Sequence, residues 1–424
     1  MKILIIGAGL GGLSAAIAFA RQGHTVILFE SRSTLSKAGG GINIRPGATR
    51  ILNTWNLSQD LEKIGDPTGS FLLRNMKTGE IATRSVLVDA SEVTDWGTTR
   101  EVLMQVLYER AKEEGVRIVF GASVEDVFDD GTKASLVLKD GEKYEADMIL
   151  AADGIRSRIR YKVLSDLNCS LDPIIGDTTL YAIRVDAKDI LGKPEMERLC
   201  VEKFACVWMG EGGFVVSRFN TTLQQFGGLF AMQSKTDQRG LWDENGDIEQ
   251  VRAFFKDRSC EDLNAVLALA TKCDRWKLAE LPDLPRWTSK GGRIVLLGDS
   301  AHAMEPNAAQ GFSMIIESIG VLEYLIARHG KDAAAQIPAI TDTWQKFRKP
   351  RVERIKRYAK ENGAVFSGKP PPSRSRLNSG GGKVRSLRDT VADGNAQFDS
   401  PDFLKWTLDY DAVAEVRLVP DESH

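Results

Sequence analysis

Residues 1–30 read MKILIIGAGLGGLSAAIAFARQGHTVILFE, and this stretch decides the fold. Residues 3–6 form an apolar run that is typical of a buried parallel strand, and residues 25–29 form a second one. Between them, apolar side chains recur at helical spacing as far as Gly23, a residue type that often follows a helix end. The stretch therefore predicts a complete strand–helix–strand unit.

Three glycines at the start of the predicted helix match the dinucleotide fingerprint G-x-G-x-x-G. Gly7 permits the tight turn, Gly9 lets a pyrophosphate approach the backbone amides, and Gly12 packs the helix on the strand. Glu30 ends the second strand, where its carboxylate can accept hydrogen bonds from ribose hydroxyls. This acid favours an unphosphorylated ribose, as in FAD or NAD. The alternative, a glycine turn without a ligand, leaves Glu30 unexplained.

Composition excludes several classes of protein. The 424 residues correspond to two or three domains at roughly 150 residues each. Hydrophobic residues make up 42% and charged residues 27%, which is typical of globular chains. The formal net charge is -2, which argues against a general affinity for nucleic acid.

Cysteine and hydropathy patterns indicate a reduced, cytoplasmic protein. The five cysteines form no C-x-x-C pair, so neither a disulfide framework nor a metal site is expected. The apolar run at the N-terminus is too short for a signal peptide. No stretch approaches the roughly 18 apolar residues that a transmembrane helix needs.

The central part of the chain changes character. Strand-like runs occur at residues 178–184, 202–208, 213–219 and 225–232, and helix-like runs follow at 248–257 and 261–270. A buried strand returns near 291–299, and a long amphipathic helix follows it. These features predict a sheet-and-helix insertion within a dinucleotide-binding domain.

The last part of the chain contains two unusual stretches. Residues 346–360 hold eight Lys and Arg, and few large apolar residues accompany them. A solvated helix face is favoured here over a membrane-surface or nucleic-acid helix. Residues 368–395 are of low complexity and read as a flexible connector, before a short helical piece at 400–416.

Two further motifs each follow a predicted strand: Asp153-Gly-Ile-Arg-Ser-Arg-Ile-Arg160 and Gly298-Asp-Ser-Ala-His-Ala-Met-Glu-Pro-Asn-Ala-Ala-Gln-Gly311. Together with the N-terminal fingerprint, they resemble the single-component flavin-dependent aromatic hydroxylases. The chain is most similar to their salicylate-hydroxylase-like branch, which is common in fungal secondary metabolism. The resemblance covers roughly residues 1–360.

The resemblance implies an α/β fold. A Rossmann-like FAD-binding domain would comprise residues 1–175 and 286–362, with an inserted mixed-sheet substrate domain at 176–285. The connector and a helical C-terminal tail would occupy 363–424.

The resemblance also implies a set of residues that bind FAD. Asp299 ends a buried strand, where its carboxylate can accept from ribityl hydroxyls. The Gln310–Gly311 turn opens the long helix toward the flavin pyrimidine ring. Asp153 would contact FAD and the nicotinamide donor, or cap a strand-to-helix turn. The full set is Gly7, Gly9, Gly12, Glu30, Arg32, Gly40, Gly41, Arg100, Asp153, Gly298, Asp299, Gly311 and Phe312.

Two arginines are the catalytic candidates. In relatives, an arginine near the place of Arg184 holds the substrate phenolate or assists oxygen transfer, although a structural ion pair is an equal alternative. The family would place a tyrosine at Arg218 and a histidine at Phe214. This departure is consistent with a substrate that is not a simple phenol. His302 and Glu317 are interpreted as structural residues.

The activity that the resemblance implies is monooxygenation. NAD(P)H would reduce FAD, and reaction with O2 would give a C4a-hydroperoxide that transfers one oxygen to an aromatic or electron-rich small molecule. The protein would act as a monomer or homodimer. The alternatives are a flavin oxidase or dehydrogenase without hydroxylation, and a non-catalytic dinucleotide-binding protein. A flavin halogenase is disfavoured because its G-x-W-x-W-x-I-P motif is missing from the sequence.

Overall fold

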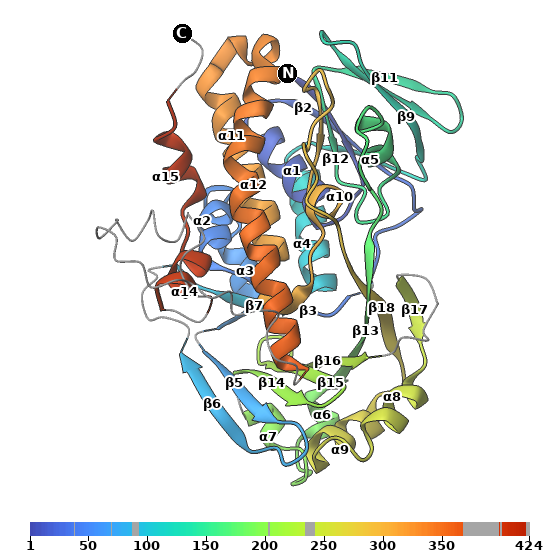
Figure 1. Cartoon of the computed structure of the whole chain (residues 1–424), viewed down its shortest axis with the longest axis vertical. Coiled ribbons are helices and arrows are strands. Elements are labelled where there is room, and N and C mark those ends of the chain that lie inside the picture. The colour runs from blue at the N-terminus through green and yellow to red at the C-terminus, as the bar shows by residue number, and fades with distance from the viewer. Residues whose placement is uncertain are drawn as a thin grey trace.

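The computed structural model describes residues 1–37, 39–68, 70–86, 93–201, 204–233, 242–367, 398 and 401–420. The molecule is elongated, with one sheet toward each end (Figure 1). Two long helices, α11 (Gly311–His329) and α12 (Ala333–Phe366), run side by side between the two ends. These helices run from the parallel sheet at one end of the molecule toward the mixed sheet at the other end.

The first sheet has five parallel strands in the order β19-β12-β1-β2-β8. Its central strand is buried on both faces, which explains its unbroken apolar sequence. The strand–helix–strand unit predicted from the first 30 residues is confirmed. The strands are β1 (Lys2–Ile6), β2 (Thr25–Glu30), β8 (Arg117–Phe120), β12 (Met148–Ala151) and β19 (Ile294–Leu296).

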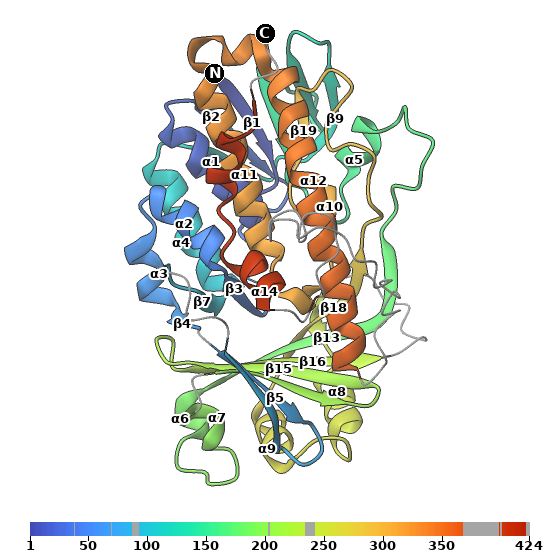
Figure 2. The same cartoon turned by 60° about the vertical axis from the view of Figure 1, so that its left-hand side comes forward.

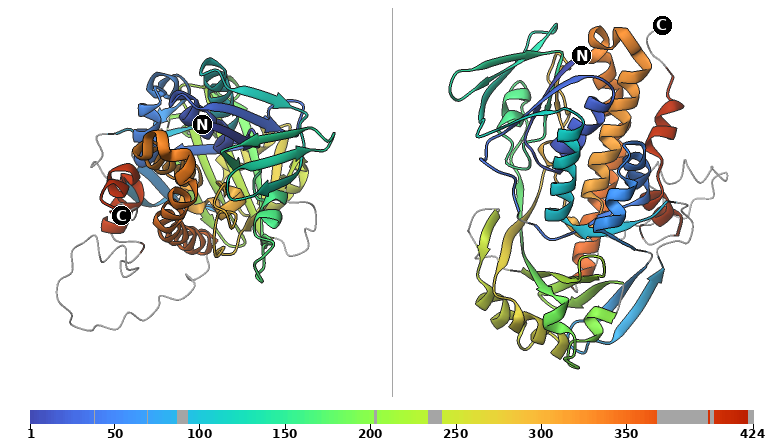
Figure 3. Two further views of the ribbon diagram at one scale, coloured as in Figure 1. Left: turned by 90° about the horizontal axis from the view of Figure 1, so that it is seen from above. Right: turned by 180° about the vertical axis from the view of Figure 1, so that it is seen from behind.

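Helices and a small sheet cover this parallel sheet. Helices α1 (Leu10–Arg21) and α4 (Arg100–Glu113) pack against each other, and α11 packs on α1. An antiparallel sheet of β9 (Val124–Asp129), β10 (Ala134–Leu138) and β11 (Lys143–Ala146) lies on the other side (Figure 3). The short helices α5 (Arg158–Val163) and α10 (Asp299–His302) begin just beyond β12 and β19.

The second sheet has eight strands in the order β17-β18-β13-β16-β15-β14-β5-β6. The four predicted strand runs are β13 to β16, and both predicted helices are present as α8 (Ile248–Phe255) and α9 (Glu261–Leu269) on its outer face (Figure 2). β5 and β6 reach this sheet from far earlier in the chain. The strands are β5 (Ser70–Asn75), β6 (Ile81–Val86), β13 (Ile174–Asp186), β14 (Ala205–Gly210), β15 (Gly213–Asn220), β16 (Gln225–Gln233), β17 (Trp242–Gly246) and β18 (Cys273–Glu280).

A third, small sheet lies between the two larger ones. It has the order β3-β7-β4, and helices α2 and α3 lead from β3 to β4. Two short helices, α6 and α7, lie between β13 and β14. The bounds are β3 (Gly41–Ile44), α2 (Pro46–Thr54), α3 (Ser58–Ile64), β4 (Asp66–Pro67), β7 (Trp96–Thr99), α6 (Ala187–Ile190) and α7 (Arg198–Val201).

The prediction of a solvated face for residues 346–360 holds for Lys346, Arg357 and Lys360, which are exposed, but it is wrong for four of the other cations. This stretch lies within α12, and Arg348, Arg351, Arg354 and Lys356 are all buried. Arg348 is 0% exposed. Buried acids, carbonyl oxygens and aromatic rings take the place of water around these cations. Val352 and Ile355 of the same stretch are also buried, so charged and apolar side chains pack together on this part of α12.

The C-terminal tail folds back onto the core. Helices α14 (Pro401–Leu408) and α15 (Ala412–Arg417) replace the single helical piece predicted at 400–416, and α15 packs on α11 (Figure 3). The predicted connector at 368–395 lies outside the described residues. Across the described ranges, no helix combines the length and apolar character required to cross a bilayer.

The Gly12→Ala substitution should destabilise the fold before any ligand binds. A Cβ at Gly12 would lie 1.9 Å from the carbonyl oxygen of Gly7, so helix and strand would have to separate. We expect a loss above about 3 kcal/mol in the free energy of unfolding, measured by urea denaturation of the ligand-free protein.

Gly9→Ala is the matched control, because a Cβ there meets no atom within 4 Å. It should leave the ligand-free stability near that of the wild type. Equal stability of both variants would contradict the packing role of Gly12.

Candidate functional site

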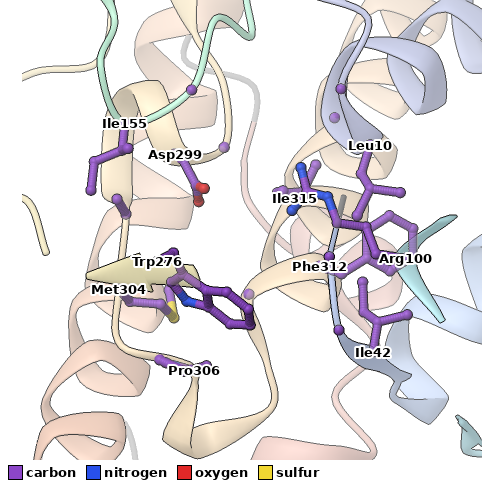
Figure 4. A pocket seen from close by; sticks show the side chains of 18 of the residues that line it. Leu10, Ile42, Arg100, Ile155, Trp276, Asp299, Met304, Pro306, Phe312 and Ile315 are labelled. Atoms are coloured by element: carbon purple, nitrogen blue, oxygen red, sulfur yellow. The ribbon is translucent and has the colours of Figure 1, made fainter. Parts of the chain in front are cut away.

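A cavity of about 970 Å³ lies between the carboxyl edge of the parallel sheet and the inner face of the eight-stranded sheet. This is where ligands bind in open α/β folds. Side chains from distant segments face one another across it: Asp299, Trp276 and Met304 on one side, and Arg100, Leu10 and Phe312 on the other (Figure 4). Its volume is at the upper end of the usual range for ligand sites, roughly 300–1,000 Å³.

The N-terminal glycine turn forms one end of the cavity. Gly7 and Gly9 line it, whereas Gly12 lies behind them in the contact between α1 and β1. The Glu30 carboxylate accepts a hydrogen bond from the Ala8 amide at 2.8 Å, which holds the acid beside the turn. The carboxylate is thereby placed where the fingerprint requires an acceptor for ribose hydroxyls.

The loop at residues 39–41 forms a second wall. Its Gly39 has φ +141°, and a Cβ there would collide with the Arg100 side chain. The Gly40 carbonyl accepts the backbone N–H of Arg100 at 3.0 Å, which joins this loop to the start of α4. Gly40, Gly41 and Arg32 all line the cavity.

Arg184 supports this loop from behind. Its guanidinium donates to Glu101 at 2.7 Å, to the Gly39 carbonyl at 2.6 Å and to Asp274 at 3.3 Å. Arg184 does not belong to the cavity lining. This placement favours the ion-pair alternative, although a catalytic role for Arg184 stays a prediction.

Arg100 and Asp299 face each other across the cavity (Figure 4). Burial lowers the pKa of Arg100 and raises that of Asp299, and in each case the charge of the other residue opposes the shift. Asp299 begins α10 directly after Gly298, so it stands at the end of β19, as predicted. An extended polar ligand between the two side chains could hydrogen-bond both charges.

Two buried oxygen atoms on the cavity wall have no hydrogen-bond partner in the described structure: Asp153 Oδ1 and Gln310 Oε1. The other oxygen of Asp153 accepts a long hydrogen bond from the Ile159 amide at 3.4 Å, so both interpretations of Asp153 are compatible with its position. Buried oxygens without partners are costly. Together with Glu30, Arg100 and Asp299, they fit a dinucleotide that carries many hydroxyl and N–H groups.

The N-terminus of α11 opens toward the cavity. Gly311 and Phe312 line it, and Gln310 precedes the first helical residue. The first amides of a helix lack partners within the helix and carry partial positive charge. A flavin ring that gains negative charge on reduction would be stabilised there.

The half of the cavity that faces the eight-stranded sheet is mostly apolar. Phe214, which occupies the expected histidine position, packs edge-on against Phe366 at the end of α12. Arg218 lines this half, and its Nε has no hydrogen-bond partner among the described residues. Burial lowers the pKa of Arg218 to about 10, so it remains cationic at neutral pH. The other lining residues here include Phe71, Leu180, Val207, Val216, Leu229 and Trp276.

Glu317 and His302 lie outside the cavity lining, in agreement with their interpretation as structural residues. Glu317 is ion-paired with Arg348 and Arg351, each at 2.8 Å. His302 packs 5.0 Å from the Trp287 ring, and burial lowers its pKa to about 3.

Sequence reasoning missed the parts of the cavity that come from remote segments. Trp276 comes from β18, a strand that the sequence pattern does not predict. Leu404 and Leu408 come from the tail beyond the low-complexity stretch. Their one detectable signal was the aromatic and apolar spacing near residues 403–410.

Asp299→Asn should abolish most flavin binding, because an amide cannot accept as strongly as the buried carboxylate that faces Arg100. Charged hydrogen bonds contribute roughly 1.5–3 kcal/mol, so we expect about 10- to 100-fold weaker binding. The flavin-to-protein absorbance ratio measures this. Asp402→Asn, on the exposed side of α14, is the control. Full flavin occupancy in the Asp299 variant would rule out its role.

His302 should make the fold acid-sensitive. Its pKa is lower in the folded state, about 3, than the ordinary value of 6.5, so the unfolded chain binds the proton first. Stability should therefore be complete above that ordinary value and fall as the pH drops, by ~2 kcal/mol near pH 5. Urea titrations of wild type and His302→Asn test this: the variant should lose part of the acid sensitivity. Identical pH profiles would contradict it.

Comparison with known proteins agrees with this geometry. Residues 1–359 match the family described as FAD binding domain. FAD-dependent monooxygenase OpS4 of Beauveria bassiana is 28% identical, over 98% of this chain and 96% of that protein. The 6-hydroxynicotinate 3-monooxygenase of Pseudomonas fluorescens is 27% identical, over 84% and 90%.

Among solved structures, a salicylate hydroxylase substrate complex superposes with a TM-score of 0.77 at 19% identity, covering 100% of this chain and 99% of that one. This likeness confirms the α/β fold with its inserted mixed sheet. The match to the family covers most of the chain, and FAD is the family's cofactor. The chain belongs to the FAD-binding-domain family of flavoprotein monooxygenases.

Proposed function

We propose that this protein uses FAD and NAD(P)H to insert one oxygen atom of O2 into an aromatic or electron-rich small molecule. The observation that carries this proposal is the continuity of the cavity. One space joins the polar dinucleotide cradle at Glu30, Arg100 and Asp299 with the apolar chamber at Phe214 and Trp276. A small substrate in that chamber would share one continuous space with the cofactor.

FAD, when bound, supplies the redox chemistry that activates O2. The chain's residues bind and orient it: Glu30 and Asp299 accept from hydroxyl groups, and Arg100 provides positive charge. The N-terminus of α11 favours negative charge on the flavin ring. The apolar chamber excludes water, which would otherwise intercept a reactive oxygen species.

Arg218 is proposed to orient the substrate. It is a cation on a largely apolar wall, and its Nε has no partner in the described structure. An arginine in this condition favours an anionic or carbonyl oxygen on the ligand. We therefore infer a planar substrate with such an oxygen near its ring.

The named substrates of the relatives are consistent with this class. The protein from Pseudomonas fluorescens acts on 6-hydroxynicotinate and the superposed structure is a salicylate hydroxylase. Both compounds are planar rings that bear a carboxylate and an oxygen substituent.

The nicotinamide donor is proposed to approach near the Asp153 motif. Arg156 and Arg158 are exposed at this edge of the cavity and can contact phosphates. Cytoplasmic location and a monomeric or homodimeric state remain predictions from the sequence.

Incubation with 18O2, NADPH and a panel of hydroxylated aromatic carboxylates tests the proposal. Mass spectrometry should show a product that contains one 18O atom, together with NADPH consumption that the substrate accelerates. NADPH consumption that yields only hydrogen peroxide across the panel would favour the oxidase alternative. A protein that neither binds FAD nor consumes NADPH would support the non-catalytic alternative.

Arg218→Met should keep FAD but lose productive oxygen transfer, because the substrate loses its charged partner. We expect product formation to fall by about 10- to 100-fold while hydrogen peroxide rises, with partial recovery in Arg218→Lys. Product and peroxide are measured in parallel. Unchanged product yield in Arg218→Met would exclude this role.

Arg184→Met separates the two interpretations of Arg184. If Arg184 supports the loop at residues 39–41, the variant should bind FAD about 10-fold more weakly, because the charge-assisted hydrogen bond to the Gly39 carbonyl is lost. If Arg184 is catalytic, the flavin content stays normal and product formation falls. Flavin titration followed by product analysis distinguishes these results.

A further inference from the structure

We propose that the C-terminal tail is a wall of the catalytic cavity and that Arg351 is the positioning residue that holds it against the start of α11. This proposal goes beyond the chemistry of oxygen transfer. It concerns how the cavity is closed, and it holds for any substrate.

The tail contributes directly to the cavity. Leu404, Thr407 and Leu408 of α14 line it, beside Gln310 and Gly311 at the start of α11. The tail comes from beyond the long low-complexity stretch, so its position must be determined by contacts at its own end of the chain. Without α14, this side of the cavity would open to solvent.

One side chain connects the tail to the start of α11. The Gln310 amide nitrogen donates to the Thr407 carbonyl at 2.8 Å. Gln310 immediately precedes the helix terminus that we assign to the flavin ring. A displacement of Thr407 therefore changes the hydrogen bonding of Gln310, which lines the cavity.

Arg351 holds the tail through hydrogen bonds and ring contacts. Its guanidinium donates to the carbonyl oxygens of Trp406 at 3.1 Å and Thr407 at 3.2 Å. It also lies 4.5 Å from the ring centre of Trp406 and 3.9 Å from that of Tyr410. Its remaining hydrogen bonds, at 2.8 and 2.9 Å, go to both oxygens of Glu317.

Glu317 orients Arg351 from the other side. It is 1% exposed and lies on α11, two turns after Gln310. Burial alone would raise the pKa of Glu317, but Arg351 and Arg348 hold it below its usual range. Glu317 therefore stays ionised and binds one side of the planar Arg351 guanidinium. The other N–H groups of the guanidinium are thereby held toward the tail.

Other contacts attach the tail without reaching the cavity. Arg50 of α2 pairs with Asp409 at 2.8 Å, and Asp409 and Arg50 are both partly exposed. Surface pairs of this kind are weak. The Phe403 ring is fully buried and packs 5.1 Å from the Tyr358 ring of α12, which anchors α14 more firmly. We therefore expect the tail to remain attached in an Arg351 variant while its register at Thr407 is lost.

Hydrogen–deuterium exchange of the FAD-loaded full-length protein tests this. Arg351→Lys keeps the charge but loses the guanidinium that donates to Glu317 and to the tail at once. Trp406→Ala weakens the same contact from the side of the tail and leaves no buried charge unpaired. In Arg351→Lys, amides at 403–410 and at 310–314 should exchange about 10- to 100-fold faster, as expected for the loss of charge-assisted hydrogen bonds. In Trp406→Ala, which removes the ring contact to Arg351, the same amides should exchange roughly 2- to 30-fold faster.

Lys405→Ala, exposed on the same helix, is the matched control and should exchange like the wild type. Acrylamide should also quench flavin fluorescence more strongly in the two test variants than in this control. Unchanged exchange in both test variants overturns the proposal. Faster exchange at 403–410 alone, with unchanged exchange at 310–314 and unchanged quenching, also overturns it. These measurements need no turnover, so a failure of the proposed activity would be seen separately.

Discussion

The structure depends on the close approach of α1 to β1. Gly12 lies so near the Gly7 carbonyl that a side chain would push the helix away. This contact places the helix terminus, the glycine turn and Glu30 at one edge of the parallel sheet. Because β12 and β19 run parallel to β1, their ends deliver Asp153 and Asp299 to the same edge. One packing constraint thereby brings together groups that are far apart in the sequence.

Buried charge organises the opposite side of the cavity. Glu317, Arg348 and Arg351 connect the two long helices in a region without solvent, and Arg351 extends the connection to the tail. Removing one partner from such a group is costly, because the others remain buried and charged. This cluster positions the two helices and the tail, whereas Arg100, Asp299 and Arg218 line the cavity itself.

Local patterns predicted the fold well where each element carries its own signal. The fingerprint, the strand-end aspartates and the Gln310–Gly311 turn are readable because turns and strand ends need particular residues. Long-range contacts were harder to predict. The ion pairs of Arg184, the union of β5 with β14 and the burial of Arg348 depend on residues more than 30 positions away. The residue pattern of one segment does not indicate which distant segment it will contact.

These features describe one cavity whose polar end fits FAD and whose apolar end we propose for the substrate. The central claim is that the cradle at the sheet edge binds FAD. The most direct test is the absorbance spectrum of the purified protein, before and after incubation with FAD and removal of the excess. We expect flavin bands at an equimolar ratio to protein, resistant to gel filtration. A folded protein that retains no flavin after this treatment would contradict the claim.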